Sequence, residues 1–157
     1  MAALEQELLT PTLGGHRARD WSSRLPWRVT SQVYVGLIGG PVAVTAIALL
    51  NARRLRVGEI SRRAMALIGI SGLVAGVLAA ALVPGQTAPR LFLQLAGVLT
   101  YGGLYLVQRA PDRVHSTFSP NDDPDDDYAS LLGPGLAAVV LGWSVEIALV
   151  LGLEAVT

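Results

Sequence analysis

The chain has 157 residues, of which 52% are hydrophobic and only 15% are charged, against roughly 25% charged in a typical soluble domain. Its twelve basic residues are all arginine and are balanced by twelve acids, so the net charge is zero and binding of nucleic acid is not expected. The absence of cysteine excludes disulfides and thiolate metal sites. His16 and His115 lie far apart in polar segments, so we predict no metal site and no cofactor.

Residues 1–29 are predicted to form a polar leader, because they lack the continuous apolar core of a secretory signal peptide. Trp21 and Trp27 flank Arg24 just before the first apolar stretch. Indole rings favour the headgroup level of a bilayer, so these tryptophans indicate an interfacial collar. The alternative is a tail in which the aromatic residues are incidental.

Four apolar stretches follow the leader, at 33–50, 64–84, 91–107 and 131–153. Each is close to the ~20 residues that a helix needs to cross a hydrocarbon layer of ~30 Å. The sequence therefore predicts an all-α fold, an integral membrane bundle of four transmembrane helices within residues 30–157. The longest connection is an acidic loop at 110–129, whose carboxylates between 121 and 127 lack the glycine and glutamate of an EF-hand and are expected to be solvated.

Glycine and proline residues in the apolar stretches predict a helix kink and sites of close helix packing. Gly40 and Pro41 lie inside the first stretch, where proline removes a helical hydrogen bond, so we predict a helix kink there. Rows of small residues at a spacing of three or four allow two helix backbones to approach closely. We expect such helix packing at Gly69, Gly72 and Gly76 of the second stretch and at Gly135 and Gly142 of the fourth.

Glu146 is the only residue within the four stretches that is charged in water. An acid near the bilayer centre costs roughly 2.5–3.5 kcal/mol, so it should not face lipid. It shares one helix face with Gly135 and Gly142, and such a face packs on a partner helix. Its candidate partners are the semi-polar residues of the third stretch, and together they form a candidate intramembrane polar site. These partners are Gln94, Tyr101 and Tyr105. Asn51 and arginines near the span ends are further candidate partners of Glu146.

The arginines flanking four crossings do not settle the orientation. One side holds five of them and the other seven. The five are Arg17, Arg19, Arg24, Arg28 and Arg90; the seven are Arg53, Arg54, Arg56, Arg62, Arg63, Arg109 and Arg113. The concentration of charge at 52–63 favours placing that loop in the cytoplasm, with both termini outside, whereas the arginines of the leader disfavour its translocation.

One motif resembles a pattern in small uncharacterised bacterial membrane proteins with four spans. Gly39-Gly40-Pro41 is followed after nine residues by Asn51 and then by Arg53-Arg54-Leu55. In those proteins a glycine-glycine-proline span ends in an asparagine followed by a basic loop. The resemblance covers about residues 31–56. It implies residence in a membrane and a bacterial origin, and the exclusive use of arginine also suggests a bacterial source.

No catalytic motif is found, so the chain is not expected to be an enzyme. The leading hypothesis is a multi-pass protein of the bacterial inner membrane, an accessory or self-associating subunit whose partners are the lipid bilayer and either further copies of itself or other membrane proteins. The alternative is a small proton-coupled transporter or channel subunit in which Glu146 is the titrating group. In the first case Glu146 pins helices together; in the second it carries the proton.

Overall fold

The computed structural model describes residues 25–82, 88–118 and 128–154. Its elements are a 3-10 helix η1 (Val29–Ser31) and the helices α3 (Gln32–Arg54), α4 (Glu59–Leu82), α5 (Ala88–Thr117) and α6 (Leu132–Glu154). The predicted all-α bundle is confirmed, since the described residues form four helices that, by number of residues and composition alone, are long and apolar enough to cross a membrane. The chain is therefore a membrane protein. Most of the leader, including Trp21, and the carboxylates at 121–127 lie outside the described residues.

The helices extend beyond the apolar stretches where polar side chains continue them. The helix α4 begins at Glu59, whose carboxylate forms ion pairs with Arg62 and Arg63 one turn later. The helix α5 continues to Thr117, ten residues past the predicted end, although Pro111 lies within it. A hydropathy pattern detects the lipid-facing part of a helix, and it does not detect a polar continuation into the interface.

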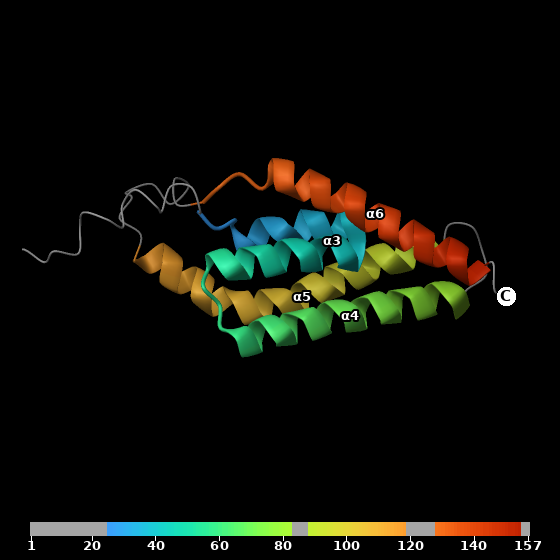
Figure 1. Cartoon of the computed structure of the whole chain (residues 1–157), viewed down its shortest axis with the longest axis horizontal. Coiled ribbons are helices and arrows are strands. Elements are labelled where there is room, and N and C mark those ends of the chain that lie inside the picture. The colour runs from blue at the N-terminus through green and yellow to red at the C-terminus, as the bar shows by residue number, and fades with distance from the viewer. Residues whose placement is uncertain (1–24, 83–87, 119–127, 155–157) are drawn as a thin grey trace, which may run out of the picture.

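The helix α3 is folded back on itself at Gly40, so that it consists of two antiparallel limbs. Gly40 has φ 70° and ψ −169°, which is not helical. A straight helix would separate residues 27 and 51 by more than about 30 Å at 1.5 Å per residue. Instead the backbone N of Trp27 lies 2.7 Å from Oδ1 of Asn51. Figure 1 shows the first limb running to the tip of the hairpin and the second limb returning beside it.

The α3 hairpin is the centre of the bundle. The helices α5 and α6 pack against it, and α4 packs against both α5 and α3 (Figure 1). We call Gly40–Pro41 the tip of the hairpin. The base is the end of the bundle formed by residues 25–31, 51–58, 108–118 and 128–132, and the far end is where α4 and α6 finish and α5 begins.

Two apolar clusters fix the limbs of the hairpin. One contains Trp27, Val35 and Ile47 together with Ala138 and Val139 of α6. The other joins the second limb to α4 and α5, and contains Val44, Ala48, Ala52, Val57, Met65 and Leu104. Because buried residues of α3 outnumber those of every other helix, α3 is the element on which the remaining helices assemble.

Candidate functional site

The site is built around the interruption of α3. Gly40 adopts a positive φ that residues with a side chain rarely adopt, so glycine is required for the reversal. Pro41 follows as the first residue of the second limb, a position where its missing N–H costs nothing. The interruption leaves helix ends inside the bundle: free carbonyls at the end of the first limb and free amides at the start of the second. These groups need partners, because lipid offers none.

Glu146 of α6 supplies an acceptor for the free amides. Its side chain is buried, with an exposed fraction of 6%, and its Oε1 accepts a long hydrogen bond of 3.5 Å from the backbone N–H of Val42. A Cβ at Gly40 would come within 2.6 Å of Oε2 and 2.8 Å of Cδ. The carboxyl group therefore lies directly against the reversal. The N-terminus of a helix carries a partial positive charge, which attracts a negative group at this position.

Trp143, one turn earlier on α6, supplies the complementary donor. Its indole Nε1 donates a hydrogen bond of 2.6 Å to the carbonyl of Ile38, at the end of the first limb. Trp143 also contacts α5, because the guanidinium of Arg90 lies 5.2 Å from the centre of its ring. A single turn of α6 thus provides a hydrogen-bond partner to each of the two helix ends that the reversal creates.

Glycines bring the neighbouring helices onto the tip. A Cβ at Gly142 of α6 would come within 2.8 Å of the carbonyl oxygen of Gly39. A Cβ at Gly97 of α5 would overlap the carbonyl oxygen of Gly36 and come within 2.7 Å of the Cα of Gly40. These two contacts leave no room for a side chain, so the tip is enclosed by backbone from α5 and α6.

The other small residues singled out in the sequence also contact helices of the same chain. A Cβ at Gly69 would overlap Thr45 of α3, and one at Gly72 would overlap Thr100 of α5. A Cβ at Gly76 would come within 2.9 Å of Ala96, and one at Gly135 within 3.3 Å of Val35. These glycines are therefore occupied by contacts within one copy of the chain.

The semi-polar row of α5 does not gather around Glu146. The only hydrogen-bond donor to Glu146 among the described residues is the N–H of Val42. The rings of Tyr101 and Tyr105 lie 5.9 Å apart, and Tyr101 packs on the cluster of the second limb. Gln94 is half-buried and forms no hydrogen bond with a described residue. From this face of α5 it is Gly97 that reaches the tip.

A second polar cluster closes the base of the hairpin. The side chain of Asn51 is fully buried; it accepts from the N–H of Trp27 at 2.7 Å and donates to the carbonyl of Trp27 at 2.9 Å and to Oε1 of Gln108 at 3.1 Å. Arg54 donates to the carbonyl of Leu25 at 2.7 Å, and its guanidinium lies 3.9 Å from the ring centre of Trp27. The cluster ties the start of the hairpin to its end.

The sequence pattern did not reveal this second cluster. From the sequence, Asn51 and Gln108 are residues at the ends of spans, Asn51 is also a candidate partner of Glu146, and Trp27 is an interfacial or an incidental side chain. The available signal was the presence of two amide side chains, those of Asn51 and Gln108, beside apolar stretches. Nothing in their spacing shows that they meet, because the reversal at Gly40 is what brings Trp27 to Asn51.

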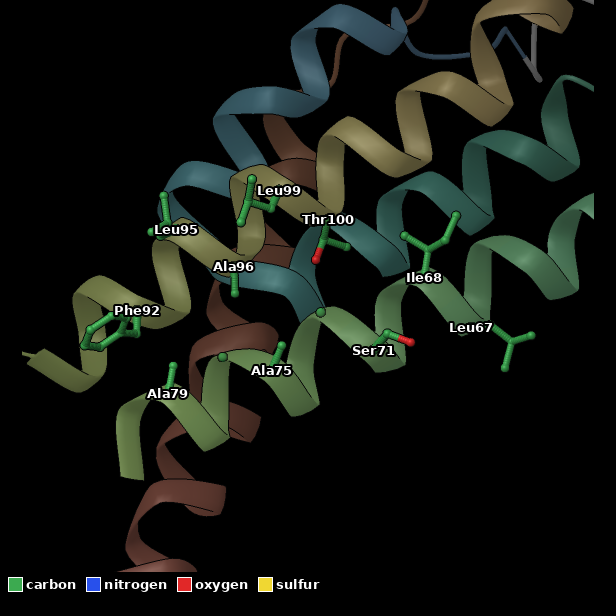
Figure 2. Close-up of a pocket in the computed structure, with 12 residues that line it drawn as sticks. Leu67, Ile68, Ser71, Ala75, Ala79, Phe92, Leu95, Ala96, Leu99 and Thr100 are labelled. Atoms are coloured by element: carbon green, nitrogen blue, oxygen red, sulfur yellow. The ribbon is translucent and has the colours of Figure 1, made fainter. Parts of the chain in front are cut away.

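An apolar groove of about 600 Å³ lies between α4 and α5. Figure 2 shows its small and aliphatic lining, with the Thr100 hydroxyl directed toward α4 and Phe92 near one end. The only side-chain polar atoms of the lining are the hydroxyls of Ser71 and Thr100. Such a lining suits contact with hydrocarbon and contains no acid or base that could activate these hydroxyls for catalysis.

No family model, no curated protein and no solved structure matches this chain.

Proposed function

We propose that this chain is a proton-translocating subunit of a bacterial inner membrane, with Glu146 as the group that takes up and releases the proton. The observation that supports this function is the position of the Glu146 carboxyl group against the interruption of α3. Ionisable residues inside membrane helices commonly belong to proton or ion pathways. Transporters likewise build their ion sites from interrupted helices whose ends lie inside the bilayer.

A complete pathway requires more than one copy of the chain or a second membrane protein. The helix α6 is held mainly by α3, and beyond Glu146 its described side chains are exposed, with Ile147 at 58% and Leu151 at 59%. A helix with one covered face and one open face offers a surface for a further helix. The partner in this proposal is a second copy or another membrane protein, within the lipid bilayer.

A specific observation also favours the alternative, a non-enzymatic accessory subunit in which Glu146 is structural. Trp143 and Glu146 together provide hydrogen bonds to the backbone on both sides of the reversal. That contribution would keep the hairpin closed even if no proton moved. The packing glycines are used within the chain, so self-association would depend on the open face of α6 rather than on those glycines.

The Glu146→Gln variant distinguishes the two functions, because glutamine can still accept from Val42 but cannot exchange a proton. We expect purified protein in liposomes containing a pH-sensitive dye to carry protons under a potassium diffusion potential. Glu146→Gln should reduce this flux at least tenfold while the assembly state in detergent stays unchanged. Glu59→Gln, which removes an exposed carboxylate at the start of α4, is the matched control and should conduct like the wild type.

Two results would contradict the proposal. One is a wild-type flux no greater than that of empty liposomes, and the other is a Glu146→Gln variant with undiminished flux. Lost assembly in the same variant would favour the accessory role.

A further inference from the structure

We propose that α3 enters and leaves the membrane on the same side, so that the described helices cross the membrane three times, with the segment before α3 in the cytoplasm and the end of α6 outside. This path of the chain does not depend on proton transfer at Glu146. The depth of the hairpin and the distribution of arginine between the two ends of the bundle support it.

The hairpin is too short to cross a bilayer. Its first limb, from Val29 to Gly39, rises only about 15–17 Å, at 1.5 Å per residue in an α-helix and slightly more in the 3-10 turn. By contrast, α5 rises about 27 Å from Arg90 to Gln108, close to the ~30 Å of the hydrocarbon core. The tip of α3 therefore reaches somewhat past the middle of the bundle and turns back.

The hydrogen bonds at the base place both ends of α3 on one side. Asn51 binds Trp27, which precedes α3, and also Gln108 of α5. The N–H of Ala129, just before α6, donates to the carbonyl of Pro26. The segment entering α3, the segment leaving it, the end of α5 and the start of α6 thus meet at the base (Figure 1). Among the described helices, only α4, α5 and α6 connect the base to the far end.

The interruption at the tip is compatible with this depth in a membrane. Non-helical backbone is tolerated within the hydrocarbon region only where protein covers it and satisfies its polar groups. Here the reversal is covered by Gly97 of α5 and Gly142 of α6, and its backbone groups bond to Trp143 and Glu146. The reversal is therefore shielded from lipid.

The hairpin changes how many arginines lie on each side of the membrane, and the orientation of the protein in the membrane is inferred from these two numbers. Among the described residues, six arginines lie at the base, two lie next to it in the first two turns of α4 and count with it, and one, Arg90, lies toward the far end. The six are Arg28, Arg53, Arg54, Arg56, Arg109 and Arg113, and the two are Arg62 and Arg63. Residues 1–24 contain no apolar stretch long enough to return through the membrane, so Arg17, Arg19 and Arg24 count with the base.

With the hairpin, eleven arginines lie on the side of the base and one on the side of the far end. Four crossings would instead place five arginines on one side and seven on the other. Arginine and lysine near span ends concentrate on the cytoplasmic side of bacterial membrane proteins. The base is therefore cytoplasmic and the far end faces outward. The 52–63 loop lies in the cytoplasm, as its concentration of arginine already favours. Unlike in the path with four crossings, the leader lies on the same side as this loop.

Labelling of single cysteines tests this path, and the natural absence of cysteine provides a clean background. The experiment uses the full chain with one of three substitutions: Ser22→Cys, Gly58→Cys or Gln86→Cys. A membrane-impermeant maleimide is added to cells whose outer barrier is permeable, and labelling of each variant is measured before and after lysis. Gly58 has open space around it, so a side chain is accommodated. We expect Gln86→Cys to react before lysis, and Ser22→Cys and Gly58→Cys to react only after it.

The pair Ser22 and Gly58 decides the number of crossings, because a crossing α3 puts them on opposite sides. Reaction of one before lysis and of the other only afterwards would overturn the hairpin path. Reaction of both before lysis, with Gln86→Cys protected, would overturn the orientation. Labelling is normalised to the amount of each variant in the membrane fraction, and the cysteine-free protein must stay unlabelled.

Discussion

Substitution of Gly40 by alanine tests the geometry of the reversal. The backbone angles of Gly40 fall in a region that is nearly restricted to glycine, and another residue held there costs about 1–3 kcal/mol. The new Cβ would also overlap the Glu146 carboxyl group, and overpacking typically costs a further 1–3 kcal/mol. We therefore expect Gly40→Ala to lower the free energy of unfolding by about 4 kcal/mol, close to a thousandfold in the unfolding constant.

The assay is reversible unfolding in mixed micelles, followed by circular dichroism. Gly102→Ala is the matched control, since a Cβ at Gly102 of α5 meets nothing within 4 Å, and it should be neutral or stabilising by up to about 1 kcal/mol. Combining Gly40→Ala with Glu146→Ala removes the overlap but keeps the backbone cost, so the double variant should lose less stability than the sum of the single variants. Equal stability of Gly40→Ala and Gly102→Ala would refute the reasoning.

Two further predictions concern the base. Asn51→Ala should lower the free energy of unfolding by about 2 kcal/mol, because it leaves the buried amide and carbonyl of Trp27 without a partner. In the same assay the control variant Gln94→Ala should lower it by less than about 0.5 kcal/mol. Equal losses in the two variants would contradict the role of Asn51 in holding the base together. Tyr128 donates a hydrogen bond to Asp112 at 3.2 Å, and burial, together with the charge of Asp112, raises the pKa of its hydroxyl to about 12. Since the folded state favours the protonated phenol, the wild type should be more stable than Tyr128→Phe by about 0.5–1 kcal/mol below pH 10. Unfolding measured from pH 8 to 12 should show this difference in stability decline as the pH approaches 12. A difference that does not depend on pH would contradict the raised pKa of Tyr128.

The sequence predicted the helices well because their burial in lipid leaves a strong compositional signal. Each of the four apolar stretches contains a helix over most of its described residues, apart from the reversal at Gly40. The small face of α6 that includes Gly135 and Gly142 is the face that packs on α3. The partner of Glu146 could not be predicted, because it is a backbone amide rather than a side chain. Helical spacing shows which residues share a face, and it does not show which helix that face meets.

The sequence predicted an interruption of α3 but not that the helix reverses its direction there. Gly40 and Pro41 predict an interruption, but the two residues are compatible with a modest bend as well as with a complete change of direction. What decides between them is the contact of Trp27 with Asn51, two residues separated by the whole hairpin. The orientation could not be derived from the sequence for the same reason, since the arginine count depends on where the chain turns.

The hydrogen bonds at the tip have a consequence for synthesis in the cell. The partners of the Ile38 carbonyl and the Val42 amide are Trp143 and Glu146, each more than one hundred residues later in the chain. A ribosome delivers the first apolar segment long before the last, so the nascent hairpin lacks these partners until α6 has been inserted. The helix α6 thus completes α3 after both have emerged, and a polypeptide truncated before α6 should fail quality control rather than accumulate as a smaller stable protein.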